Sequence, residues 1–274
     1  MKELSIILSL TLALFLSIAV QAEDTDYQTG MTALKKGELN QALTSLQQAA
    51  VKNPHNKEYA QEFMILRQVI AIQSQLDRQP NVTNWNPTAQ RLRTYYEQKG
   101  IDSLLLNLDQ KIYAKHPTVN NAALLGESFV ANDKADEAIA LLSNLLQKTP
   151  LTQAVLGLAY LKDDDKEAAS YIAASLADAL MTNPLRLRLA RIESGLGQKD
   201  KAIATLITLF EQTPPSQHIA IRELCKNATE FTSLQSDPAF IAAMQTSSKV
   251  TESACSGGSS CGTCPMRAQC PSAQ

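Results

Sequence analysis

The sequence predicts an all-α protein in which antiparallel helix pairs stack into a solenoid, and three observations support this. The chain of 274 residues is 45% hydrophobic but only 5% aromatic, so its core must consist mainly of Leu, Ala and Ile. The 10 Gly and 11 Pro leave long stretches without a helix breaker, which favours helix over sheet. Four prolines (Pro117, Pro150, Pro184 and Pro214) are separated by 33, 34 and 30 residues, and each follows an amphipathic stretch. Such a period is typical of units that stack on their neighbours.

The first residues have the pattern of a secretory signal peptide. Lys2 precedes an apolar run from Leu4 to Val20, and the triplet Val20-Gln21-Ala22 provides the small residues that a cleavage site requires. The alternative is an uncleaved membrane anchor, because the run is close to the minimum length that spans a bilayer. The acidic residues directly after Ala22 favour cleavage. We therefore expect 1–22 to be a signal peptide, the mature chain to be periplasmic, and no membrane attachment after cleavage.

Short motifs recur along the chain with similar spacing. In the first unit, Gly30 precedes the segment Gly37–Ala42, and Asn53-Pro54 closes the unit. Comparable combinations follow further along: Tyr96, Gly100 and Pro117; Gly126, Phe129, Ala138 and Pro150; Gly157, Tyr160, Ala168 and Pro184; Ala190, Gly197, Ala202 and Pro214. This arrangement resembles the tetratricopeptide repeat, a helix–turn–helix unit of about 34 residues.

The residue types in these motifs have a physical reason. Small side chains allow the two helices of a unit to pack closely, and larger apolar residues at helical spacing fill the remaining space. Gly37, Gly100 and Gly197 suit the turn between two helices, where a Cβ can be unfavourable. One departure is the stretch Lys57–Arg78, which has the periodicity of a single long amphipathic helix. It is followed by a loop up to Trp85, whose indole we expect to pack onto the solenoid.

The signal-peptide pattern, the resemblance and the change in composition after the repeats together divide the chain into consecutive segments. A signal peptide at 1–22 precedes the repeats, which lie at 23–56, 57–85 (irregular), 86–118, 119–150, 151–184 and 185–215. A helical cap at 216–247 and a Ser/Gly/Cys-rich tail at 248–274 follow the repeats. The family fold is a right-handed superhelix whose first helices line a concave groove for a peptide or a partner segment. Carried over by position, the groove residues would be Thr94, Glu127, Leu158 and Arg191. These four do not reproduce the Lys/Asn/Arg clamp with which some family members bind a terminal carboxylate.

The tail contains four cysteines, Cys255, Cys261, Cys264 and Cys270, in the spacing C-x5-C-x2-C-x5-C. The tail has too few apolar residues to fold by burial. Export favours disulfides between these cysteines. Four thiolates could instead bind Zn or an Fe–S cluster, and Cys261-Gly262-Thr263-Cys264 has the spacing of a redox pair. All three alternatives remain open, so no cofactor is certain. We expect Cys225, in contrast, to be a buried apolar thiol.

The remaining composition excludes several functions. A net charge of −2 and a pI near 6.0 do not favour nucleic-acid binding. The chain has no zinc-protease, nucleophile-elbow, phosphate-loop or dinucleotide motif, so we expect no enzymatic activity. Asp163-Asp164-Asp165 lacks the ligand spacing of a calcium loop and is typical of a solvated turn. The sequence therefore predicts an exported scaffold or adaptor that binds a protein or peptide partner. The alternative is a metal- or redox-handling accessory protein that works through its cysteine tail.

Overall fold

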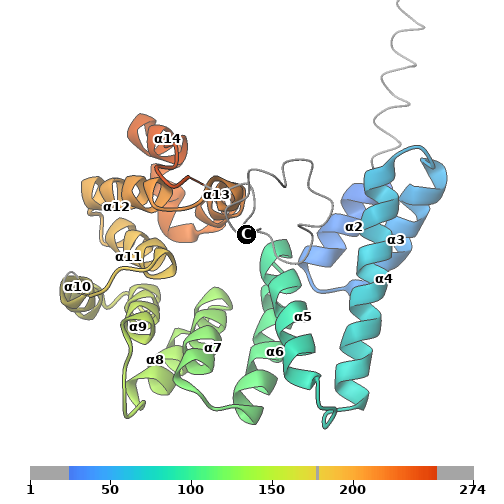
Figure 1. Ribbon diagram of the computed structural model, residues 1–274, viewed down its shortest axis with the longest axis horizontal. Helices are drawn as coiled ribbons and strands as arrows, with labels where there is room; N and C mark the ends of the chain where they lie inside the picture. Colours follow the sequence, from blue (N-terminus) through green and yellow to red (C-terminus); the bar gives the residue numbers. More distant parts are fainter. Residues whose placement is uncertain (1–24, 177–178, 252–274) are drawn as a thin grey trace, which may run out of the picture. The chain divides into compact units, whose positions relative to one another are not determined.

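The computed structural model describes residues 25–176 and 179–251, and these form an all-α, repeat-like structure (Figure 1). No strand occurs in these two ranges. The chain divides into two compact units, and the boundary falls between Lys134 and Ala135. The signal peptide predicted at 1–22 and the four tail cysteines lie outside the described residues. None of the helices within the described ranges is long and apolar enough to cross a membrane.

Between residues 25 and 134, the first unit contains six consecutive helices. Their bounds are α2 Thr25–Lys35, α3 Leu39–Lys52, α4 Lys57–Arg78, α5 Trp85–Lys99, α6 Asp102–Lys115 and α7 Val119–Ala131. The predicted long helix is α4 and has the same bounds as predicted. It begins where the side chain of Asn56 accepts a hydrogen bond from the backbone N–H of Glu58 (3.0 Å). Each helix packs against the next one in the chain, as expected for a stack of helix pairs.

Close helix crossings in the first unit depend on small residues. A Cβ added to Gly30 on α2 would lie 2.9 Å from the Cγ and 3.2 Å from the backbone N of Leu46 on α3. The core then continues through Leu66 on α4 to Trp85, which is buried at the start of α5. The indole Nε1 of Trp85 donates a hydrogen bond to the carbonyl oxygen of Leu76 (3.3 Å). Trp85 therefore packs onto the unit, as the sequence predicted.

The second unit is also built from consecutive helices, and its described part ends in a helical cap. Its elements are α8 Ala135–Ser143, α9 Pro150–Lys162, α10 Lys166–Ser175, α11 Asn183–Gly195, α12 Lys199–Glu211, the 3₁₀ turn η1 Pro215–Gln217, α13 His218–Asn227, η2 Thr229–Leu234 and α14 Pro238–Met244. Pro150 and Pro184 lie in the first turns of α9 and α11. A backbone N–H in the first turn has no acceptor within the helix, so its absence in proline removes no helical hydrogen bond. The elements from η1 onward form the C-terminal cap.

The turns within the helix pairs use the left-handed backbone region. Gly37, Gly100 and Gly197 have φ values of 78°, 64° and 74°, which confirms their predicted role. In the turns after α7 and α9, aspartates take the same conformation, with φ of 58° at Asp133 and 61° at Asp164. The next residue, Asp165, caps α10 by accepting a hydrogen bond from Ala168 N (3.0 Å). Asp164 and Asp165 therefore lie in the turn between α9 and α10, as the sequence predicted.

Candidate docking site

The groove residues predicted in the first unit lie on helix surfaces. Thr94 on α5 is exposed, and its hydroxyl donates to the Gln90 carbonyl oxygen one turn earlier (3.1 Å). Glu127 on α7 is half-buried. Both side chains are accessible to some degree from solvent, so they stay in the set of residues that we propose for partner binding.

The two groove residues predicted in the second unit have other environments. Leu158 on α9 is only 1% exposed and packs in the core, so its side chain cannot line a surface groove. Arg191 on α11 forms two hydrogen bonds with the carboxylate of Glu230 in η2, from Nε (3.1 Å) and from Nη2 (3.0 Å). Ser194 Oγ also donates to the carbonyl oxygen of Glu230 (2.6 Å). The ion pair between Arg191 and Glu230 therefore links η2 of the cap to α11.

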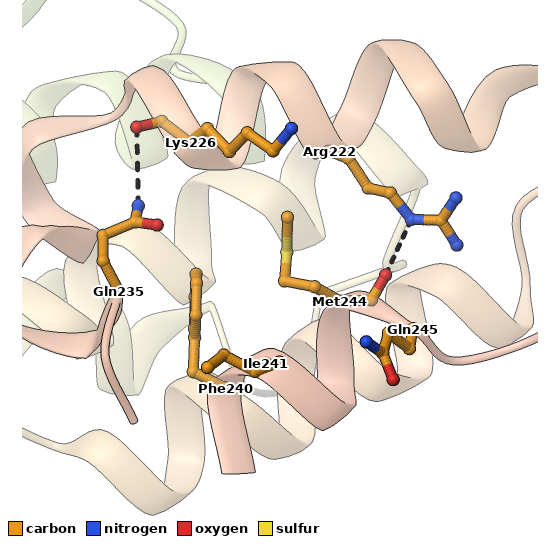
Figure 2. A pocket seen from close by; sticks show the side chains of 7 residues that line it. All are labelled: Arg222, Lys226, Gln235, Phe240, Ile241, Met244 and Gln245. Carbon is orange, nitrogen blue, oxygen red and sulfur yellow. Dashed lines mark hydrogen bonds between the residues drawn. The ribbon is translucent and has the colours of Figure 1, made fainter. Parts of the chain in front are cut away.

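A cleft opens on the surface of the cap between α13 and α14 (Figure 2). Its volume is about 530 Å³. The residues that line it are Arg222, Lys226, Gln235, Phe240, Ile241, Met244 and Gln245. In Figure 2, Arg222 and Lys226 extend from one side, and Phe240, Ile241 and Met244 face them from the other. A cleft of this size lies within the usual range of about 300–1,000 Å³ for ligand sites.

The two helices form this cleft because each has a core face and a cleft face. On α13, His218 and Cys225 are buried, whereas Arg222 and Lys226, one helical turn apart, line the cleft. On α14, Phe240 and Ala243 are buried. The next positions, Ile241 and Met244, are more accessible and line the cleft floor.

Both cations of the cleft have neighbours that define their positions. Arg222 Nε donates to the carbonyl oxygen of Met244 (2.7 Å), and its guanidinium lies 5.6 Å from the centre of the Phe210 ring. Lys226 Nζ lies 2.7 Å from Glu223 Oε1, in a pair whose side chains are 58% and 57% exposed. Such an exposed pair contributes little to stability. Arg222 is therefore a fixed part of the cleft wall, whereas Lys226 can exchange its partner at low cost.

Large apolar side chains are exposed on the same cap. Ile219 and Leu224 on α13 are 73% and 43% exposed, and Ile241 on α14 is 44% exposed. The terminal unit of a repeat array needs a polar outer face for solubility. Ile241 lines the cleft, so an accessible aliphatic side chain lies where a partner segment would be bound.

Cys225 and His218 belong to the core beneath the cleft. The thiol of Cys225 is fully buried, and this burial raises its pKa to about 12, although the nearby Arg191 acts in the opposite direction. Cys225 is the buried thiol that the sequence predicted. His218 Nε2 lies 3.0 Å from the carbonyl oxygens of both Phe210 and Thr213, so this nitrogen carries the hydrogen.

A buried polar cluster in the first unit was not predicted. Asp109 on α6 accepts hydrogen bonds from Arg93 Nε on α5 (2.9 Å) and from Ser128 Oγ on α7 (2.6 Å). Burial raises the pKa of the Asp109 carboxyl, and the effect outweighs the opposing charge of Arg93. A sequence signal did exist, because Asp109 lies between Leu105 and Ile112 on the apolar face of its helix. The cluster links three helices through buried Arg93, Asp109 and Ser128 side chains, so we interpret it as structural.

No group of three or more His, Cys, Asp or Glu side chains within the described ranges could hold a metal ion. The predicted ligands Cys255, Cys261, Cys264 and Cys270 lie outside these ranges. Comparison of the chain with models of protein families and with curated proteins gave no match.

Proposed function

We propose that the protein is an exported scaffold of tetratricopeptide type that binds a partner protein through a segment of that partner. The cleft of the C-terminal cap carries this proposal. It combines exposed aliphatic residues with two cations on a cap that ion pairs attach to the preceding helices. A surface of this composition loses unfavourable apolar hydration when a partner covers it.

The repeat-like helix pairs support the tetratricopeptide assignment. The turn glycines, the close crossing at Gly30 and the prolines in the first turns of α9 and α11 all have the roles that this repeat requires. Thr94 and Glu127 remain candidates for a second contact with the partner in the first unit. Leu158 and Arg191 are left out of this contact set because of their burial and ion pairing.

Site-specific photo-crosslinking in the source cells tests the proposal. A photoreactive amino acid is introduced in place of Gln245 in the cleft, of Thr94 on α5, or of the exposed Lys36 as a control. We expect a discrete adduct from position 245 that is absent from position 36. An adduct from position 94 alone would support a scaffold that does not use the cleft. Adducts from no position, or equal adducts from all three, would contradict the scaffold function.

A second candidate function is metal or redox handling by the cysteine tail. The clustering of Cys255, Cys261, Cys264 and Cys270 in the sequence favours it, whereas burial and a raised pKa make the Cys225 thiol unreactive in the folded protein. Exchangeable sulfur chemistry in the chain is therefore assigned to Cys255, Cys261, Cys264 and Cys270. In this proposal the helical units hold a partner and the tail supplies it with Zn, an Fe–S cluster or disulfide exchange.

Metal analysis and thiol counting on protein purified without a metal-affinity tag distinguish these possibilities. A metal bound in stoichiometric amount, and lost when the four tail cysteines are replaced by Ser, would support a ligand set. Reversible oxidation without bound metal would support redox exchange. A metal-free tail with stable disulfides that mild reductants do not open would contradict both.

A further inference from the structure

We infer that the cap cleft binds an acidic segment of the partner that also carries large apolar side chains. This inference rests on the proposed scaffold function and specifies the chemistry of its partner. It has two parts, the charge of the cleft and its apolar floor, and each part comes from different residues.

The charge of the cleft selects an acidic ligand. Arg222 and Lys226 are the two charged residues in its lining, and both are cations. Arg222 donates from Nε to the carbonyl oxygen of Met244, and its guanidinium lies 5.6 Å from the centre of the Phe210 ring, so its position in the lining is fixed. The planar guanidinium group matches the geometry of a carboxylate. Partner carboxylates beside Arg222 and Lys226 would therefore find complementary charge.

The floor of the cleft selects apolar side chains. Met244 and the exposed part of Ile241 form this floor above the buried Phe240. Methionine is unbranched and adapts its shape to different partners, which suits a surface that accepts a flexible segment. Ile219 lies one helical turn before Arg222 on α13 and is 73% exposed, so it extends the apolar surface beyond the cleft.

The position of the cleft is fixed before a ligand arrives. Arg191 and Glu230 attach η2 to α11, and an ion pair between Lys199 and Asp237 attaches the start of α14 to α12. A preformed cleft avoids the cost of ordering its walls on binding. The two cap helices are therefore suited to bind a segment of the partner.

The chain's own tail is a poor occupant by composition. From 252 to 274 its sequence contains one large apolar residue, Met266, and one acidic side chain, Glu252. A segment of this kind can supply neither several apolar contacts nor a row of carboxylates. A partner segment that fits the cleft carries several large apolar side chains and several carboxylates.

Fluorescence anisotropy with designed peptides tests the inference on the full chain. The probe is a short labelled peptide that alternates Glu with Leu; in two control peptides Gln replaces Glu, or Ser replaces Leu. We expect the Glu/Leu peptide to bind at least about fivefold more tightly than either control, and high salt to weaken its binding. Lys226→Glu should weaken binding about fivefold and Ile241→Ser about tenfold. Lys36→Glu, a matched charge change outside the cap, should have no effect.

Both variants alter partly exposed side chains, and unchanged thermal unfolding would verify that they fold. Equal binding of the Glu/Leu and Gln/Leu peptides, or no effect of Lys226→Glu and Ile241→Ser, would overturn the inference. Binding that occurs only after deletion of 252–274 would identify the tail as the occupant and would also overturn it. Dimers that Ile241→Ser dissociates would assign the cleft to a second copy instead. A cross-link from position 94 with no peptide binding would leave the scaffold function intact while the inference fails.

Discussion

Replacing Glu230 by Gln is expected to loosen the C-terminal cap without changing its shape. The substitution leaves Arg191 with a neutral partner in place of the carboxylate that accepts from its Nε and Nη2 at 3.1 and 3.0 Å. Hydrogen bonds to charged groups contribute about 1.5–3 kcal/mol when they are buried. The side chains of Arg191 and Glu230 are 19% and 13% exposed, so solvent screening reduces this value. We expect the free energy of cap opening to fall by about 2 kcal/mol.

The reactivity of Cys225 measures cap opening directly. Its thiol is fully buried in the cap core, so a thiol reagent reaches it only when the cap opens. The assay uses the full chain with its four tail cysteines replaced by Ser, which leaves Cys225 as the only thiol. A loss of about 2 kcal/mol corresponds to labelling about thirtyfold faster for Glu230→Gln.

Two comparisons make this prediction refutable. Glu223→Gln removes a carboxylate from an exposed pair on the same cap, so it should change the labelling rate less than about twofold. Arg191→Met combined with Glu230→Gln should label more slowly than the sum of the single effects predicts, because the two residues interact. Equal rates for Glu230→Gln and the unaltered chain would refute the assignment of Arg191 to the cap.

Three further predictions concern stability. Gly197→Ala should lower the free energy of unfolding by about 1 kcal/mol in urea denaturation. A Cβ at this position would meet no atom within 4 Å, so the loss would come from the backbone strain of alanine at a φ of 74°. An unchanged free energy of unfolding would contradict the turn assignment. Gly30→Ala should cost about 1 kcal/mol net in the same assay, since crowding against Leu46 exceeds the gain in helix propensity; a stabilised variant would contradict the close crossing. Burial raises the folded-state pKa of Asp109 above its ordinary value of 3.8, so its contribution to stability is lost as pH rises through the folded pKa. The stability of Asp109→Asn relative to the unaltered chain should therefore rise as pH increases from 3.8 through the folded-state pKa of Asp109, and the opposite trend would show that the Arg93 charge dominates.

Local features of the fold were predictable because they depend on short sequence distances. The periodicity of Lys57–Arg78 predicted α4 with its correct bounds, and the glycines at 37, 100 and 197 marked turns of positive φ. Asp133 and Asp164 adopt the same conformation without being glycine. Aspartate tolerates this region but is common in many other settings, so the residue type alone did not indicate a left-handed turn.

The candidate site depends on long-range pairing, and for this reason the sequence did not reveal it. Arg191 and Glu230 are 39 residues apart, and only the fold of the cap brings them together. Leu158 had a groove position by repeat register, but the packing around α9 buries it. The cleft itself is lined by residues of α13 and α14, which are separated in the chain by η2. No spacing within either helix encodes how the two are placed together.

Paired charge variants test most directly whether the cap cleft recognises an acidic segment of a partner. The measurement is the dissociation constant of the partner segment that cross-links to position 245, determined for Lys226→Glu and for Glu223→Gln. Glu223 is the carboxylate that competes for Lys226, at 2.7 Å from its Nζ. We expect opposite changes in the dissociation constant, with weaker binding for Lys226→Glu and tighter binding for Glu223→Gln. Changes in the same direction, or no change in either variant, would contradict it.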